Sequence, residues 1–181
     1  MLLNQLYFYT STIRQWKPLL RDFRFENIIL DSLSYLHRKE CIKVYGFVIM
    51  PNHIHLILQL LKANGKETPA ASLMKFTAHK FEQHLQAVAP VALQKFKVEQ
   101  TSRRYNFWQP NLDWFWLNYI PTIKQKLNYI HCNPLQERWK LCERTTDYPY
   151  SSVQFYVSGK SSFDFLHHYS EFVESVLWKT Q

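Results

Sequence analysis

The chain has 181 residues, of which 46% are apolar, so it is long enough to bury one hydrophobic core. It carries 22 Lys and Arg against 14 Asp and Glu, a net charge of +8 spread along the sequence, which makes nucleic acid the first partner to consider. Three cysteines without CxxC spacing argue against a disulfide framework or a structural zinc site, and no segment reaches the length of a membrane span, so we expect one folded unit in the cytoplasm with no membrane partner.

The first half of the chain is predicted to form three strands and a helix. Leu2–Ile13 alternates and is rich in aromatic and β-branched residues, which predicts a strand. Phe25–His37 carries apolar residues at helical spacing and predicts a helix. Cys41–Met50 and His53–Leu61 are predicted strands separated only by Pro51–Asn52, where proline fixes φ at the first turn position and asparagine tolerates positive φ at the second. These two strands are predicted to form a hairpin.

A second helix, a fourth strand and a third helix complete the predicted order. Pro69–Gln86 follows a capping Thr68, and we expect its buried residues to be Leu73, Phe76, Phe81 and Leu85. Arg103–Gln109 is the predicted fourth strand. Asn118–Asn133 is the third helix, and it should end there because the residue before Pro134 is disfavoured in the α region. This order predicts an α+β, ferredoxin-like (split βαβ) antiparallel sheet with two helices on one face, plus an additional C-terminal helix.

Two histidines stand one residue apart in the stretch MPNHIHLIL. Because alternate side chains of a strand share a face, His53 and His55 should point one way, and Ile54 and Leu56 the other. Their Cα atoms would lie about 7 Å apart, close enough for both imidazoles to bind one metal ion. Eight histidines make such a pair common by chance, and two partly buried histidines bonded to backbone would otherwise be the simpler explanation.

A tyrosine lies on the polar side of the third helix. The apolar stripe of this helix consists of Ile120, Ile123, Leu127 and Ile130. Tyr129 falls outside the stripe, on a side shared with Gln125 and Asn133. Asn133 follows Tyr129 by one turn, so its amide oxygen could complete a metal site that the tyrosine hydroxyl also approaches, with Gln125 as a second candidate for that ligand. The alternative is an exposed tyrosine on an amphipathic helix, in a chain with eleven tyrosines.

Three motifs in this order resemble those of the single-tyrosine HUH transposases, and most closely their REP-associated tyrosine transposase branch. The motifs are HIH at His53–His55, YIHCNP at Tyr129–Pro134 and DYPYSS at Asp147–Ser152. The resemblance covers residues 1–152, which we expect to form the transposase domain, and the ferredoxin-like core is also what it implies. Residues 153–181 match nothing that we can place, and we expect this C-terminal extension to pack on the same domain.

The resemblance also implies a site and its chemistry. His53, His55 and Asn133 would bind a divalent metal, Mg²⁺ or Mn²⁺, although imidazole ligands by themselves suit zinc, iron, copper or nickel. Tyr129, on the additional helix, would attack a phosphodiester of single-stranded DNA beside a hairpin, leaving a 5′-phosphotyrosine link and a free 3′-hydroxyl. Basic residues near this helix could bind the phosphates: Arg103, Arg104, Lys124, Lys126, Arg138, Lys140 and Arg144. Unpaired bases could stack on Trp108, Trp114 or Trp116.

Two other functions fit the same residues. A catalytically silent protein that binds nucleic-acid hairpins would keep the fold and the basic surface, but it would tolerate the loss of Tyr129 and of metal. A metal-dependent hydrolase using the same two histidines would turn over with water and leave no covalent protein adduct. Some members of the wider family are dimers and others act as monomers, so both a homodimer and a monomer fit the sequence.

Overall fold

The computed structural model describes residues 2–99, 104–110 and 113–177, with side chains to residue 175. Arg103, one of the expected phosphate contacts, lies outside these ranges. The strands are β1 (Leu6–Thr12), β2 (Ile42–Met50), β3 (His53–Leu60) and β4 (Asp113–Trp116). The helices are α1 (Phe23–Arg38), α2 (Pro69–Val88), α3 (Pro90–Leu93), α4 (Ile120–Cys132), α5 (Val153–Ser158) and α6 (Tyr169–Leu177). No helix in the described ranges is long and apolar enough to cross a membrane.

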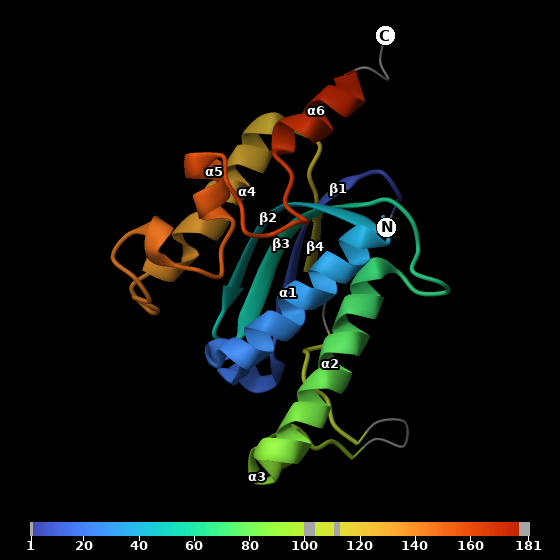
Figure 1. Cartoon of the computed structure of the whole chain (residues 1–181), viewed down its shortest axis with the longest axis vertical. Helices are drawn as coiled ribbons and strands as arrows, with labels where there is room; N and C mark the ends of the chain where they lie inside the picture. Colours follow the sequence, from blue (N-terminus) through green and yellow to red (C-terminus); the bar gives the residue numbers. More distant parts are fainter. Residues whose placement is uncertain (1, 100–103, 111–112, 178–181) are drawn as a thin grey trace.

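The four strands form one antiparallel sheet in the order β2-β3-β1-β4. The expected hairpin is present, because β2 and β3 pair from Ile42↔Leu60 to Met50↔His53 with only two residues between the strands. The first strand then lies between β3 and β4, so β1 is central although it begins the chain (Figure 1). This strand order is the one that the split βαβ arrangement requires, so the α+β prediction is confirmed.

Helices α1 and α2 cover one face of the sheet, as expected. Leu33 of α1 and Phe81 of α2 join Ile54, Leu56 and Leu58 of β3 in one buried cluster. Helix α1 begins at a capping Asp22, whose side chain accepts from the backbone N–H of Arg24, and α2 begins at the predicted Thr68 cap, which accepts from Ala71. The apolar side of β3 is thus the side that the two long helices bury.

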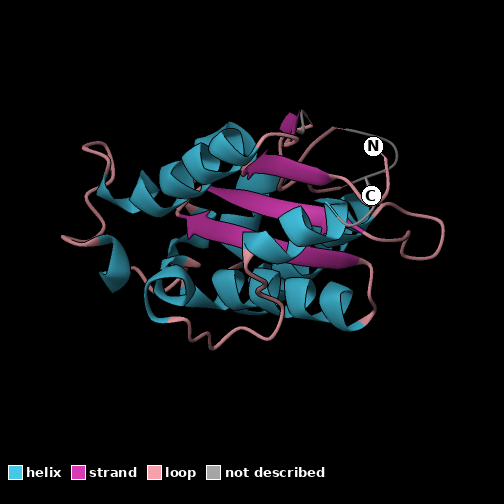
Figure 2. Ribbon diagram, turned by 90° about the horizontal axis from the view of Figure 1, so that it is seen from above, coloured by secondary structure: helices cyan, strands magenta, loops and turns pink. Residues whose placement is uncertain are grey.

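Helix α4 covers the opposite face, so the sheet has helices on both sides (Figure 2). Ile123 and Leu127 of α4 pack against Phe8, Val48 and Ile57, which come from β1, β2 and β3. The prediction of two helices on one face is therefore correct for α1 and α2, and the additional helix makes a second core layer. Residues on the odd-numbered positions of β3 face this layer, and His53 and His55 are among them.

The fourth strand lies later in the chain than predicted. Within 104–110 the structure has only isolated bridges, Tyr105 with Lys97 and Trp108 with Ile13. The strand that pairs with β1 is Asp113–Trp116, in register from Tyr7↔Trp116 to Thr10↔Asp113. Phe107 and Trp108 are instead buried in the cluster under α2, where Trp108 donates a hydrogen bond to Thr77. Burial of these two rings, rather than sheet pairing, explains the apolar run that predicted a strand.

Two local predictions in the helices were wrong. Phe76 is exposed, because the core position on that turn of α2 belongs to Thr77, whose hydroxyl donates to the carbonyl of Leu73. Helix α4 does end before Pro134, but Asn133 keeps α-helical angles of φ −56° and ψ −43° and opens a short 3₁₀ turn. The steric rule for residues before proline is a preference, and the tighter turn accommodates Asn133 here.

The segment after α4 closes the free edge of β2. The DYPYSS motif runs along this edge: Ile49 donates to the carbonyl of Tyr150, and Ser152 donates to that of Phe47. Farther along, His167 donates to the carbonyl of Val44. An uncovered edge strand would invite pairing with other chains, so this segment protects the sheet.

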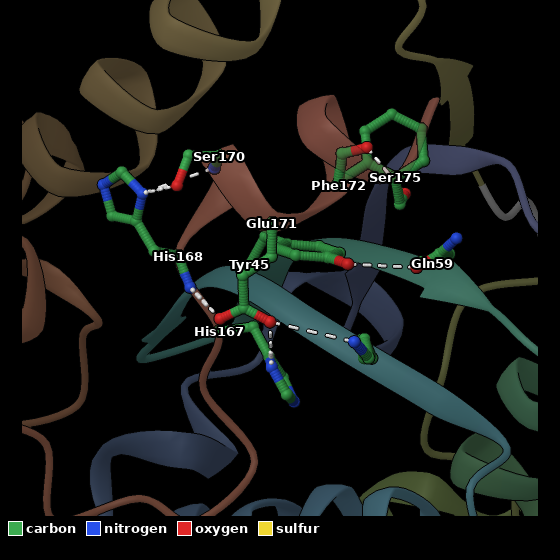
Figure 3. Close-up of polar contacts among 9 residues, drawn as sticks. Tyr45, Gln59, His167, His168, Ser170, Glu171, Phe172 and Ser175 are labelled. Carbon is green, nitrogen blue, oxygen red and sulfur yellow. Dashed lines mark hydrogen bonds and ion pairs between the residues drawn. The ribbon is translucent and has the colours of Figure 1, made fainter. Parts of the chain in front are cut away.

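Helix α6 fixes the C-terminal segment over the beginning of β2 (Figure 3). Glu171 of α6 accepts from the ring of His167 and lies 3.7 Å from the ammonium of Lys43. The Tyr45 hydroxyl donates to Gln59 across the sheet, and the Tyr45 ring lies 6.1 Å from that of Phe172. These contacts pack α6 against the same sheet as α4.

Candidate metal and tyrosine site

The site lies where β3 begins, on the face that α4 covers. His53 and His55 are buried there, with their ring centroids 4.8 Å apart. Phe8 of the neighbouring β1 stacks on His55 at 5.3 Å, and Trp139 lies 5.8 Å from His53. The structure therefore brings the two imidazoles together, as the alternation of the strand predicted.

Hydrogen bonds orient both imidazole rings through their Nδ1 atoms, so the Nε2 atoms remain free to bind a ligand. His53 Nδ1 lies 2.7 Å from Asn52 Oδ1, an atom that only accepts, so Nδ1 carries the proton and Nε2 keeps its lone pair. His55 Nδ1 lies 2.8 Å from Thr10 Oγ1, and when it donates there its Nε2 is likewise free to bind a metal. A hydrogen bond that fixes the far nitrogen is the usual support of a metal-binding histidine.

Asn52 has a different part in the turn from the one predicted. Its backbone does not adopt positive φ. Its side chain is buried, and besides accepting from His53 it donates to the carbonyl of Trp16 at 3.0 Å. The side-chain amide of Asn52 thus links the imidazole of His53 to the loop after β1.

The surroundings keep both histidines neutral. Burial, and then the positive charge of Arg138, lowers the pKa of His53 to about 4. Burial lowers the pKa of His55 to about 3, with smaller effects from His53, Lys126 and Arg138. Neutral imidazole is the form that binds metal, so both rings are ready as ligands at neutral pH.

Tyr129 projects from α4 toward this pair. Its ring lies 5.2 Å from that of His55 and 6.1 Å from that of Phe8, and 38% of the residue is exposed. The ammonium of Lys126 lies 5.8 Å from the Tyr129 ring and 4.7 Å from the Phe8 ring. Tyr129 is thus both reachable from solvent and adjacent to the histidines, a combination that a core tyrosine would not show.

Helix α4 reaches this position because β2 has a glycine beneath it. A Cβ atom on Gly46 would lie 2.6 Å from Cδ2 of Leu127, well inside ordinary contact. A bulge in β2 between Val44 and Gly46 bends the strand at the same place. The missing side chain lets Leu127 pack directly on the strand, which sets the height of Tyr129 above the sheet.

Asn133 is fully buried one turn after Tyr129, at the end of α4. Neither Oδ1 nor Nδ2 of Asn133 has a hydrogen-bond partner among the described residues, and the same is true of His55 Nε2. Unpaired buried polar atoms are costly, so these atoms are available to bind a ligand or a water molecule. Two neutral imidazoles and an amide oxygen are suitable donors for a divalent cation, and Gln125, the other candidate ligand, is exposed.

The donor set lacks carboxylates and thiolates. Nowhere in the described part of the chain do three or more His, Cys, Asp or Glu residues gather as a metal cluster would. A site of two histidines and one asparagine would carry no ligand charge, so bound phosphate would supply the negative charge.

The expected phosphate-binding residues do not all lie at this site. Lys126 and Arg138 lie near the site, since both affect the pKa of His55. Lys124 is exposed on α4. Arg104 lies on the other face, where it lines a groove with Met74 and His79 of α2. Arg144 is paired with Asp147 at 2.8 Å.

Several residues of the site could not be singled out from the sequence. Thr10 and Phe8 reach His55 only through the pairing of β1 with β3, which sets Thr10 opposite His55. Trp16 and Trp139 flank His53 from two loops, at 6.5 and 5.8 Å between ring centroids. The one local signal was the polar Asn52 directly before His53. From the sequence, the hairpin turn alone accounts for Asn52, so its hydrogen bond to His53 was not predicted.

Comparisons with known proteins support the fold. No protein-family model matches the chain, and no curated protein does. A solved structure of a REP-associated tyrosine transposase bound to a REP hairpin is similar, with a TM-score of 0.61 and 16% identity over 92% of this chain and 87% of that one. A protein of Deinococcus radiodurans R1 assigned as a transposase gives a TM-score of 0.43 and 18% identity over 69% of this chain and 87% of that one, and no argument rests on it. The first likeness confirms the fold that the three motifs implied.

Proposed function

We propose that the chain is a REP-associated tyrosine transposase, a metal-dependent enzyme that nicks and joins single-stranded DNA beside hairpins. One observation carries the proposal. The ring centroid of the exposed Tyr129 lies 5.2 Å from that of His55, and the buried Nε2 of His55 has no hydrogen-bond partner among the described residues. A nucleophile next to a set of metal donors is what phosphodiester cleavage through tyrosine needs. The solved transposase with the same fold is bound to a REP hairpin, which supports a DNA hairpin as the partner here.

In this mechanism, Tyr129 forms the covalent intermediate. Its oxygen attacks the phosphorus in line, the bond from phosphorus to the 3′-oxygen breaks, and the proton of the tyrosine is passed to the leaving oxygen. The products are a 5′-phosphotyrosine and a free 3′-hydroxyl. Because one phosphodiester replaces another, a second 3′-hydroxyl can reverse the reaction without an external energy source.

His53, His55 and Asn133 would hold the metal, Mg²⁺ or Mn²⁺. When bound, the metal supplies electrostatic stabilisation of the charge that develops on the phosphate oxygens. The protein side of this arrangement is the orientation of the rings, which Asn52 and Thr10 provide through Nδ1.

Positive side chains beside the site favour a phosphate there. Lys126 lies over Phe8, Phe115 and Tyr129, and Arg138 acts on both histidines. A single strand is the favoured substrate, because an unpaired backbone bends easily into a small site and leaves its bases free to stack.

The test is a covalent capture assay. Hairpins with single-stranded flanks, taken from the DNA around the gene, are incubated with the protein and Mn²⁺ or Mg²⁺ and separated on a denaturing gel. We expect a protein–DNA adduct that disappears with chelator and with Tyr129→Phe, while hairpin binding on a native gel persists. Tyr119→Phe is the matched control: Tyr119 is an exposed tyrosine just before α4, and its loss should leave the adduct.

The other outcomes distinguish the alternatives. Hairpin binding without an adduct or a nick, with either metal, would overturn the enzyme assignment in favour of a silent hairpin-binding protein. Nicks without any adduct, also in Tyr129→Phe, would show a hydrolase that uses water.

A further inference from the structure

An exposed tryptophan stands directly beside the metal-site histidine. Trp16 lies in the loop after β1, and 58% of the residue is exposed. Its ring meets that of His53 edge to face, with the centroids 6.5 Å apart and the planes at 70°. The predicted stacking residues are placed less well. Trp108 is buried, and Trp114 and Trp116 pair with Tyr9 and Tyr7, whose rings face the α1 and α2 side of the sheet.

The backbone that presents this ring is strained. Gln15 and Trp16 both have positive φ, 56° and 57°, a region that residues with a Cβ rarely enter and bulky ones hardly at all. The loop is held by hydrogen bonds from Ile13 to the carbonyl of Asn52 at 2.8 Å and from Asn52 Nδ2 to the carbonyl of Trp16 at 3.0 Å. Strain that the surroundings maintain is typical of functional sites. The same amide of Asn52 fixes His53, so ring and imidazole are positioned together.

Three positive side chains lie in or near the strained loop. Arg14 and Lys17 flank Trp16 in sequence, and Lys95 directly precedes Phe96. Burial, and then the charges of Arg14 and Lys95, lower the pKa of Lys17, so both lie near it. The ammonium of Lys17 also lies 5.4 Å from the ring of Phe96. An aromatic ring set among cations is the pattern of a surface that binds single-stranded nucleic acid, where bases stack and phosphates pair with Lys and Arg.

We propose that Trp16 is a stacking platform for the unpaired base next to the phosphate that Tyr129 attacks, and that Arg14, Lys17 and Lys95 bind the phosphates beyond it. The inference rests on the proposed function, because it takes the scissile phosphate to lie at His53 and His55. Trp16 is thus a positioning residue, which would hold the strand so that the phosphate stays aligned with Tyr129.

The test measures stacking apart from cleavage. In a Tyr129→Phe background, hairpins carry the fluorescent base 2-aminopurine at each unpaired position near the cleavage site, which the wild-type adduct maps. We expect quenching at one position, lost in Trp16→Gly and retained in Trp16→Phe. Glycine suits the positive φ of position 16, so this variant removes the ring and leaves the backbone unstrained. Tyr35→Ala, an exposed aromatic residue on α1, is the control and should leave the quenching unchanged.

Affinity gives a second measure. Loss of one stacked base should weaken binding of the flanked hairpin about 5- to 150-fold in Trp16→Gly. If the wild-type protein forms the adduct, but Trp16→Gly binds the hairpin with the same affinity and the same quenching as the parent protein, the stacking proposal is wrong. The proposed function would still stand in that case. If the wild-type protein forms no adduct at all, the proposed function fails first.

Discussion

Replacing Gly46 by alanine should displace α4 and with it Tyr129. The new Cβ would lie 2.6 Å from Leu127 Cδ2, so the two must separate by about 1 Å to reach ordinary contact. Little room is available, because Ile57 Cδ1 and Ser152 Oγ would already lie 3.7 Å from that Cβ and Leu127 is itself buried. The expected result is that the Leu127 side chain turns away from the new methyl group and that α4 shifts on β2 to make room for it.

The magnitudes follow from two opposing terms. Overpacking a close-packed core costs roughly 1–3 kcal/mol, while replacing glycine within a strand gains about 0.5–1 kcal/mol. Taking the low ends together and the high ends together, we expect Gly46→Ala to lower the free energy of unfolding by about 0.5–2 kcal/mol. Under the proposed function, a displacement of about 1 Å at Tyr129 should slow adduct formation on the order of 100-fold.

A double-mutant cycle with Leu127→Ala tests the cause. Leu127→Ala alone should cost about 2–5 kcal/mol, because it leaves a cavity in the layer under α4. In Gly46→Ala/Leu127→Ala the added methyl enters that cavity, so urea denaturation should show the double variant more stable than the sum of the two losses by about 1–3 kcal/mol. Additive losses within about 0.5 kcal/mol, or a Gly46→Ala variant with unchanged stability, would refute the packing argument.

Three further predictions concern Asn52, which supports the site, and two residues that bond each other at the covered edge of β2, His131 and Ser152. Asn52→Ala removes the partner of His53 Nδ1 and should raise the Mn²⁺ concentration needed for half-maximal adduct formation about 10- to 100-fold; an unchanged metal dependence would contradict this. Burial lowers the pKa of His131 from 6.5 to about 4, so the folded state binds its proton less readily than the unfolded state. The stability that His131 contributes is complete above pH 6.5 and should fall by at most about 1.4 kcal/mol per pH unit from there to pH 4, and His131→Gln should remove one proton from that slope in denaturation curves. Ser152→Ala removes a buried hydroxyl that accepts from the backbone N–H of Phe47 and bonds His131, and it should cost about 2 kcal/mol in the same assay, whereas a loss below 0.5 kcal/mol would show the edge contact to be unimportant.

The sequence was informative wherever a short-range period decides which way a side chain points. The two-residue repeat of β3 predicted that His53 and His55 share a face, because alternate residues of any strand do. The apolar stripe of α4 predicted that Tyr129 would stay out of the core, and its exposure confirms this. The spacing of one helical turn predicted Asn133 near Tyr129, and that stays a prediction. The order of strands and helices, and from it the antiparallel sheet, could be predicted as well, because each strand and each helix has its own period of apolar residues.

The tertiary structure was needed wherever contacts join segments distant in sequence. Two aromatic segments, 103–109 and Asp113–Trp116, have the composition of a strand. Within the described residues, only the second pairs with the edge of β1, and the first contributes the buried rings of Phe107 and Trp108. Thr10 orients His55 only through the register of β1 with β3, and the approach of Leu127 to Gly46 depends on two elements about eighty residues apart. Such pairings have no local period, because they follow from how whole surfaces fit together. For that reason His53, His55, Tyr129 and the loop at Trp16 come together only in the folded chain.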